Sequence, residues 1–225
     1  MDALTITDLS FKYRSENEFI FKNISFSVNK GSVVVFSGLS GSGKTTLCYL
    51  LTGIIPRTYK GDISGTIKLF GNDIADLSAE KISSDLGIVF QDPETQLFMP
   101  TVEDELAFAP ENLCLSRDEI ENRISAALEI TGIKDLRFKE TNTLSGGQKQ
   151  LVAIASVLTM EPKILIFDEI TSQIDSMGRE KIRELIISLK NEGKTIIIIE
   201  HGHGNFDLAD EIYEIKNSSL KRIKV

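Results

Sequence analysis

The sequence predicts an α/β protein whose core is a mixed, largely parallel β-sheet. Three apolar runs, at residues 33–36, 164–167 and 195–199, have the length of buried strands. Helical patterns separate these runs, and alternating strands and helices are typical of a parallel sheet covered on both faces. With 225 residues, of which 41% are apolar and 26% charged, the chain is long enough for one domain with a large core.

The first part of the chain predicts an N-terminal antiparallel β portion. Residues 4–13 and 19–28 alternate between apolar and polar side chains, as half-buried strands do. After the run at 33–36, a loop containing several glycines leads into a helix that we expect to end near Gly53. Residues 64–70 predict a further strand.

The middle of the chain predicts a helical lobe, residues 92–159, inserted into a core formed by residues 1–91 and 160–225. Its first helix is expected over residues 101–108. We expect this helix to stop at Pro110, because proline lacks the N–H group that continues a helix.

The last part of the chain returns to alternating strands and helices. A helix with apolar side chains along one face is expected from Ser176 to Gly193. The buried strand at 195–199 follows it, and two short strands around residues 212–215 and 220–223 complete the predicted fold.

The segment between the first buried run and its helix has the features of a phosphate-binding loop. Its glycines allow the backbone N–H groups to turn inward, and the helix N-terminus adds unpaired donors and partial positive charge. Lys44 can reach the β- and γ-phosphates, and the Thr45 hydroxyl is suited to bind Mg²⁺. The alternative is an ordinary glycine-rich turn. We expect a nucleoside triphosphate to bind through Gly38, Ser40, Gly41, Ser42, Gly43, Lys44, Thr45 and Thr46.

Polar side chains stand where three further buried strands end. Gln91 follows the first, Asp168 and Glu169 follow the second, and Glu200 and His201 follow the third. Because ligands of open parallel sheets bind beyond the carboxyl ends of the strands, we expect these groups to surround one nucleotide.

The chemistry of these residue types suggests their roles. Asp168 fits the second carboxylate that organises Mg²⁺, and its neighbour Glu169 can accept a proton from the attacking water. The alternative is that both carboxylates cap the following turn. His201 can hydrogen-bond the γ-phosphate, although a structural histidine is the common case. His203 could form a metal pair with it, but without a third ligand nearby a solvated loop residue is favoured.

A second glycine-containing segment, Leu144-Ser145-Gly146-Gly147-Gln148, precedes the helical stretch at residues 151–158. Taken alone, Ser145 is an N-cap and the glycines form a tight turn, as at an ordinary helix start. Together with the phosphate loop, the segment predicts a second anion-binding device.

In this order the segments resemble an ABC transporter ATPase subunit, over nearly the whole chain from about Leu4. The matching motifs are Gly38 to Thr46 as Walker A, Gln91 as the Q-loop, Leu144 to Gln148 as the signature, Ile164 to Glu169 as Walker B and His201 as the switch histidine. The octapeptide at residues 91–98, QDPETQLF, is most similar to the ATPases of energy-coupling-factor importers, which take up vitamins, cobalt or nickel.

The resemblance implies ATP as the nucleotide, with Mg²⁺ bound by Thr45, Gln91 and Asp168. It implies that the residues acting in catalysis are Glu169, His201, Gln91 and Lys44. It also implies a head-to-tail dimer, with the same or a related chain, in which each ATP lies between one Walker A and the other subunit's Ser145, Gly146, Gly147 and Gln148.

Two further motifs and two departures accompany this resemblance. Tyr13 matches the aromatic residue that stacks on adenine, although it could be an exposed edge-strand tyrosine. Ser172-Gln173-Ile174-Asp175 matches the D-loop, which makes Asp175 a candidate site residue. Ile170 replaces the proline that commonly follows the catalytic glutamate, and Glu200 replaces a small residue.

The function implied is ATP hydrolysis that powers import through transmembrane subunits. The net charge of −8 disfavours a nucleic-acid partner, and no apolar run approaches the ~20 residues that span a bilayer. Without a secretory leader, we expect a cytoplasmic protein on the inner face of the cell membrane. The alternatives are a soluble ATPase acting on a scaffold, as in iron–sulfur cluster assembly, and a nucleotide sensor that does not hydrolyse ATP. The interval between Walker A and the signature is too short for the coiled coil of a DNA-repair ATPase.

Overall fold

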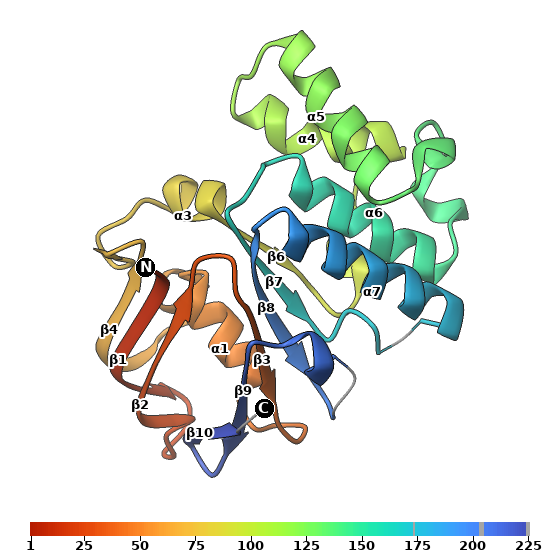
Figure 1. Cartoon of the computed structure of the whole chain (residues 1–225). Helices are drawn as coiled ribbons and strands as arrows, with labels where there is room; N and C mark the ends of the chain where they lie inside the picture. Colours follow the sequence, from red (N-terminus) through yellow and green to blue (C-terminus); the bar gives the residue numbers. More distant parts are fainter. Residues whose placement is uncertain (173, 203–204, 224–225) are drawn as a thin grey trace.

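The computed structural model describes residues 1–172, 174–202 and 205–223, and it contains two β-sheets with helices around them (Figure 1). The smaller sheet has the strand order β2-β1-β4-β5 and is antiparallel throughout. Its strands are β1 (Asp2–Tyr13), β2 (Phe21–Asn29), β4 (Gly61–Leu69) and β5 (Asn72–Asp73). The predicted antiparallel portion is therefore confirmed.

The larger sheet has the order β10-β9-β3-β8-β7-β6. Its strands are β3 (Val33–Ser37), β6 (Leu86–Val89), β7 (Ile164–Asp168), β8 (Thr195–Glu200), β9 (Glu211–Lys216) and β10 (Ser219–Ile223). All neighbouring pairs are parallel except β9 with β10. Every residue of β3, β7 and β8 is buried, because both faces of the sheet are covered.

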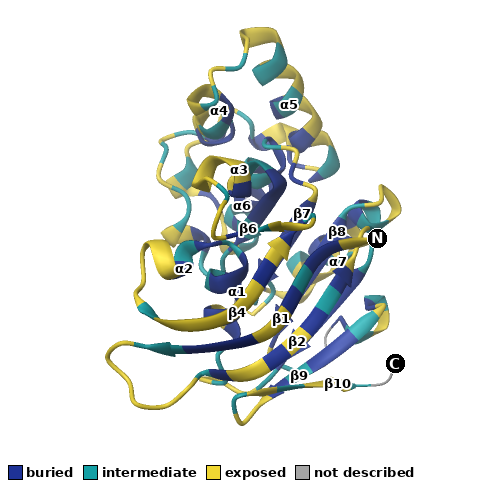
Figure 2. Cartoon of the chain, turned by 90° about the vertical axis from the view of Figure 1, so that its left-hand side faces the viewer, coloured by how far each residue is buried: buried dark blue, intermediate teal, exposed yellow. Residues whose placement is uncertain are grey.

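Alternate residues of the parallel strands enter different hydrophobic clusters. In β3, Val33 and Val35 pack in the cluster that includes α7 (Ser176–Asn191), whereas Val34 and Phe36 pack in the cluster that includes α1 (Lys44–Leu51) and the smaller sheet. Figure 2 shows buried residues along β1 and β2 of the smaller sheet. The larger sheet is thus held between two apolar layers, which fixes the positions of its strand ends.

Three longer helices follow β6 and lie together at one end of the molecule (Figure 1). They are α4 (Val102–Asn112), α5 (Arg117–Ile130) and α6 (Gly146–Leu158). Helix α6 contacts α4, α5, α7 and β6, so it joins the other two helices to the sheet. The division into a core and a helical lobe at residues 92–159 stays a prediction.

The expectation that Pro110 stops a helix was wrong. Helix α4 contains Pro110 and continues to Asn112. The proline lies in the last turn, where its ring is buried and only one backbone donor is missing. The carbonyl groups of Ala109 and Pro110 then accept hydrogen bonds from Leu113 and Leu115, which close the helix end.

Several short elements were not predicted. They are α2 (Ile54–Arg57), α3 (Ala79–Asp85) and the 3₁₀ turns Pro93–Thr95, Lys134–Leu136, Thr141–Thr143 and Phe206–Leu208. Helix α3 begins where the Ser78 hydroxyl accepts a hydrogen bond from the Lys81 N–H. Among the described residues, no helix combines the length and the apolar character needed to cross a bilayer.

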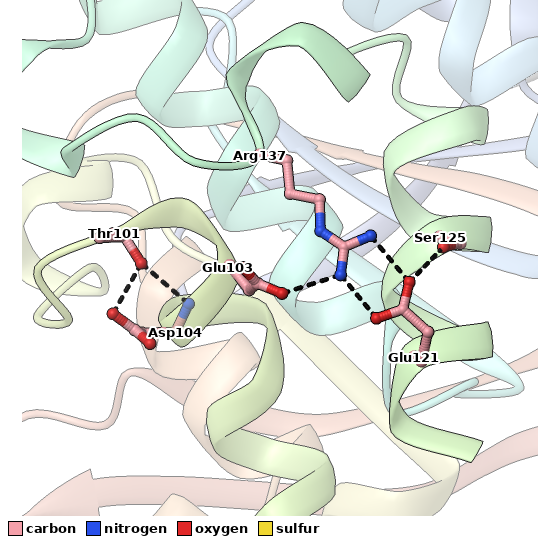
Figure 3. Close-up of polar contacts among 6 residues, drawn as sticks. All are labelled: Thr101, Glu103, Asp104, Glu121, Ser125 and Arg137. Carbon is pink, nitrogen blue, oxygen red and sulfur yellow. Dashed lines mark hydrogen bonds and ion pairs between the residues drawn. The ribbon is translucent and has the colours of Figure 1, made fainter. Parts of the chain in front are cut away.

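Arg137 connects the chain ahead of α6 to both α4 and α5 (Figure 3). Its guanidinium donates to Glu103 at 2.8 Å and to the two oxygens of Glu121 at 2.7 and 2.6 Å. These hydrogen bonds lower the pKa of Glu121 to about 2. The backbone of Arg137 also accepts from the Glu103 N–H, so the segment that leads to Ser145 is fixed against α4.

Candidate active site

The loop after β3 is shaped by glycines. Gly41 and Gly43 have φ values of 75° and 102°, which residues with a Cβ rarely adopt. At Gly38 the limit is space, because a Cβ there would lie 2.6 Å from the Ser42 Oγ and 2.8 Å from the Ile215 carbonyl oxygen. The loop therefore needs glycine at the three predicted positions.

The ammonium of Lys44 lies back inside this loop. It donates to the carbonyl oxygens of Gly38 at 2.9 Å and Leu39 at 3.0 Å, and the side chain is only 5% exposed. Its Nζ also lies 3.2 Å from a carboxylate oxygen of Glu169. The Ser42 hydroxyl oxygen is buried and has no hydrogen-bond partner among the described residues. A buried cation beside an unpaired hydroxyl fits the oxygens of a polyphosphate.

The register of the large sheet aligns the strand ends. Ser37 of β3 pairs with Glu200 of β8, and Ile199 of β8 pairs with Asp168 of β7. Strand β6 runs parallel to β7. The loop and the polar groups that follow these strands therefore lie along one edge of the sheet, as the sequence predicts.

Asp168 lies at the end of β7 beside the start of α1. Its carboxylate accepts hydrogen bonds from the Thr45 hydroxyl and the Cys48 thiol. Burial, followed by the nearby charge of Glu169, raises the pKa of Asp168 to about 6. A hydroxyl and a carboxylate oxygen are the hard ligands that Mg²⁺ prefers, so Thr45 and Asp168 fit this ion.

Glu169 has a left-handed backbone, with φ of 51°, which is uncommon and strained for a residue with a Cβ. Its N–H donates to the Ile199 carbonyl at 3.0 Å, and its carbonyl accepts from the Ser172 N–H at 3.1 Å. These bonds hold the turn, and the carboxylate lies against Lys44. The backbone strain is thus tied to the direction of this side chain.

His201 and Gln91 border the group formed by Lys44, Asp168 and Glu169. His201 is exposed and lines a pocket of about 370 Å³ together with Glu169. The Gln91 Nε2 donates to the Ser172 Oγ at 3.2 Å, which links the end of β6 to the turn after Glu169.

The segment at Ser145 forms the start of α6. The Ser145 hydroxyl accepts from the Gln148 N–H, and the Gln148 side chain accepts from the Ser145 N–H, so the two residues make a capping box. The expected N-cap at an ordinary helix start is confirmed, with Gly146 and Gly147 in the first turn of the helix. The hydrogen bonds of Ser145 are made within α6, and its side chain and Gly146 are exposed.

Two contacts join α6 to the segment around Gln91. The Lys149 Nζ lies 2.5 Å from a carboxylate oxygen of Glu94, and the Gln150 Nε2 donates to the Phe90 carbonyl at 3.2 Å. The start of α6 is therefore connected directly to the residues on either side of Gln91.

Tyr13 and Asp175 have local partners. The Tyr13 hydroxyl lies 3.1 Å from the Thr46 Oγ1, which puts this half-buried tyrosine beside the start of α1. Asp175 caps α7 by accepting from the Gly178 N–H at 2.7 Å. Stacking of Tyr13 on adenine stays a prediction. Gln173 and His203 lie outside the described residues.

Sequence reasoning missed two contacts at this site. Cys48 is buried and its thiol contacts Asp168. Its position three residues after Thr45, on the same face of α1, was the available signal. The carboxylate of Glu200 accepts from Asn205, and nothing in the sequence pattern indicates that bond.

A glycine loop between a strand and a helix, with carboxylates at the end of a neighbouring parallel strand, defines the phosphate-loop nucleoside triphosphatases. Residues 21–172 match the family described as ABC transporter. The chain therefore belongs to the family of ABC transporter ATP-binding proteins, and it is an ATPase.

Individual relatives agree with this. The chain is 43% identical over 202 residues to a putative ABC transporter ATP-binding protein of Pyrococcus horikoshii, covering 89% of this chain and 71% of the relative. It is 40% identical over 222 residues to the energy-coupling factor transporter ATP-binding protein EcfA1 of Ureaplasma parvum, covering 98% and 74%. Several longer relatives are matched over only 33% to 38% of their length.

A solved structure has the same fold. The chain superposes on cbiO1 from Clostridium perfringens, described as part of the ABC transporter complex cbiONQ, with a TM-score of 0.88 and 36% identity. The match covers 98% of this chain and 87% of cbiO1. The predicted α/β fold is thus confirmed.

Proposed function

We propose that this chain hydrolyses ATP to power import of a substrate through a membrane complex of the energy-coupling-factor type. The similarity to EcfA1 along nearly the whole chain supports this proposal, as does the fold shared with cbiO1. The observation that carries the catalytic part is the convergence of Lys44, Asp168 and Glu169 at one edge of the sheet.

In the proposed mechanism, the triphosphate takes the place of the protein groups that contact Lys44. The ammonium exchanges Glu169 and the Gly38 and Leu39 carbonyls for phosphate oxygens, and the inward-facing loop amides stabilise the same charge. Glu169, released from Lys44, accepts the proton of the attacking water. His201, on the same pocket as Glu169, holds that water and the γ-phosphate.

Mg²⁺ would be held by Thr45 and Asp168, with Gln91 as a third contributor. When bound, this ion supplies positive charge that neutralises the phosphate oxygens. Asp168 must be ionised for this role, and the Thr45 hydroxyl that now donates to Asp168 would turn its oxygen toward the ion.

A second ATPase subunit, identical or related, would complete each site. In this arrangement the Ser145 hydroxyl and the N–H groups of Gly146 and Gly147 contact the γ-phosphate bound to the partner's loop, and Gln148 supports them. The exposure of Ser145 and Gly146 at the start of α6 supports this role. Tyr13 would stack on adenine, and Asp175 would lie at the subunit interface.

The membrane subunit would dock in an apolar groove between α3, β6, α4 and α6. This groove has a volume of about 680 Å³ and lies next to the segment that follows Gln91. Phe98 and Phe108 meet edge to face at its rim, with ring centroids 4.7 Å apart, and they are 63% and 39% exposed. An exposed aromatic pair in a hollow is typical of a protein-binding site.

Affinity purification of the tagged full chain from detergent-solubilised membranes tests the proposal. A multispanning membrane protein is expected to copurify with the wild type and to be lost with Phe98→Asp and Phe108→Asp. Phe138→Asp is the matched control, because Phe138 is 73% exposed and lies outside the groove. Recovery of a soluble assembly scaffold in place of a membrane protein would support the alternative function and overturn import.

A further inference from the structure

Strand β8 ends in Glu200, a buried residue whose carboxylate accepts hydrogen bonds from Asn205. Glu200 and Asn205 are 7% and 6% exposed. The Asn205 N–H donates to one oxygen of Glu200 at 3.0 Å, and the Asn205 side-chain amide donates to the other oxygen. Both oxygens of Glu200 are therefore engaged by a residue five positions further along the chain.

His201 directly follows Glu200, at the end of β8. On the other side of His201, the carbonyl of Gly202 accepts a hydrogen bond from the Ser37 Oγ at 3.2 Å. Ser37 is the last residue of β3, directly ahead of the phosphate loop. The backbone on both sides of His201 is thus attached to strand ends of the large sheet, although the imidazole itself is exposed.

The choice of a carboxylate at this position has an energetic meaning. Burial raises the pKa of Glu200, so ionisation at this place is unfavourable unless hydrogen bonds offset it. The bonds from Asn205 supply that compensation. The charged neighbours on the packed elements, Arg183 and Asp207, satisfy each other in an ion pair. An apolar side chain at this position would need no hydrogen bonds from Asn205.

We propose that Glu200 is a positioning residue for catalysis: the hydrogen bonds from Asn205 fix the Glu200 side chain, and thereby the end of β8 from which His201 reaches the pocket shared with Glu169. This inference rests on the proposed function, in which His201 contacts the γ-phosphate and the attacking water. Glu200 lines the same pocket but acts through its neighbour, because its oxygens are turned to Asn205.

Steady-state ATP hydrolysis by the full chain tests the inference. Glu200→Ala is expected to lower kcat roughly tenfold, the effect of losing one hydrogen-bonded constraint on the transition state, while KM for ATP changes little. Glu200→Gln should retain most of the activity, because an amide oxygen can accept from the Asn205 N–H and the Asn205 amide can rotate to accept in return. Asn205→Ala should lower kcat in the same direction as Glu200→Ala.

A double-mutant cycle with His201→Ala gives the decisive result. If Glu200 acts through His201, Glu200→Ala causes no further loss of kcat once His201 is absent. Losses that multiply would overturn the inference, as would full activity of Glu200→Ala. Full activity of His201→Ala alone would instead show that the catalytic role proposed for His201 is wrong.

Two controls separate positioning from folding. Asp207→Asn removes the ion pair between Asp207 and Arg183 and leaves Asn205 unchanged. This variant should keep the kcat of the wild type. Binding of a non-hydrolysable ATP analogue, measured by thermal shift, should be close to wild type in Glu200→Ala, Glu200→Gln, Asn205→Ala and Asp207→Asn. Loss of analogue binding by Glu200→Gln and Asn205→Ala would assign the contact to folding and overturn the inference.

Discussion

The ammonium of Lys44 lies 3.2 Å from a carboxylate oxygen of Glu169. The phosphate-binding cation and the proposed base therefore contact each other directly, and both side chains are at most 15% exposed. Such a pair competes with a ligand, because a phosphate must break it before Lys44 can contact the phosphate oxygens. In the proposed mechanism, nucleotide binding and the release of Glu169 from Lys44 are therefore one event.

Glu169→Gln should therefore tighten the binding of a nucleotide as well as stop its hydrolysis. The expected gain is several-fold, because the phosphate no longer has to displace a carboxylate from the buried Lys44 ammonium. Titration with a non-hydrolysable ATP analogue measures it. Glu180→Gln, in the same pocket but without contact to Lys44, serves as the control. Equal or weaker binding by Glu169→Gln would contradict the proposed competition.

The buried Asp168 gives the nucleotide-free chain a defined pH dependence. Its pKa of about 6 in the folded chain exceeds the ordinary value, so the folded state holds the proton more tightly than the unfolded state. The free energy of unfolding should then fall as the pH rises from about 4 through 6. Asp168→Asn removes this slope and should raise that free energy at pH 7 by on the order of 2 kcal/mol.

Urea unfolding in the presence of a chelator, at several pH values, measures this effect. Asp118→Asn is a suitable control, because Asp118 is exposed at the start of α5. A wild-type slope that persists unchanged in Asp168→Asn would assign the pH dependence to other groups.

The ion pair between Lys149 and Glu94 is expected to transmit changes at Gln91 to the start of α6. Glu94→Lys puts like charges together and should slow ATP turnover several-fold. The double variant Glu94→Lys, Lys149→Glu restores the opposite charges and should recover the rate. Steady-state hydrolysis measures both. Glu129→Lys breaks the exposed ion pair between Glu129, on α5, and Lys134. This variant should have no effect on ATP turnover. If the double variant does not recover the wild-type rate, the Lys149–Glu94 pair does not connect Gln91 to the start of α6.

The Arg137 contacts predict a loss of stability in acid. The pKa of Glu121, lowered to about 2, means that its bond to Arg137 stabilises the folded chain above about pH 4.5 and is lost as the pH falls toward 2. Glu121→Gln should therefore unfold at a lower temperature than wild type near neutral pH, and the difference should shrink in acid. Thermal melts between pH 7 and pH 3 test this, with Glu111→Gln as an exposed control on α4. A difference in unfolding temperature that stays constant with pH would show that the ionised Glu121 carboxylate is not its source.

Much of the fold could be predicted because it depends on local composition. Strands buried on both faces need continuous apolar runs, and Val33 to Phe36 and Ile164 to Phe167 are such runs. Once the strands are parallel, their polar ends must share an edge, so the meeting of Lys44 with Glu169 followed from the order of elements alone.

The features that were missed depend on tertiary contacts. Pro110 remains helical because the buried last turn of α4 tolerates one missing donor. The bond of Glu200 to Asn205 joins the end of β8 to a residue beyond it, and the contact of Cys48 with Asp168 arises from packing of α1 against β7. None of these contacts leaves a periodic signal in the sequence.

The release of phosphate from saturating ATP and Mg²⁺ by Glu169→Gln tests the catalytic site most directly. The site described here predicts a rate at least about a hundredfold below wild type, the contribution of a general base, with binding of the ATP analogue retained. Phosphate release at the wild-type rate would contradict it.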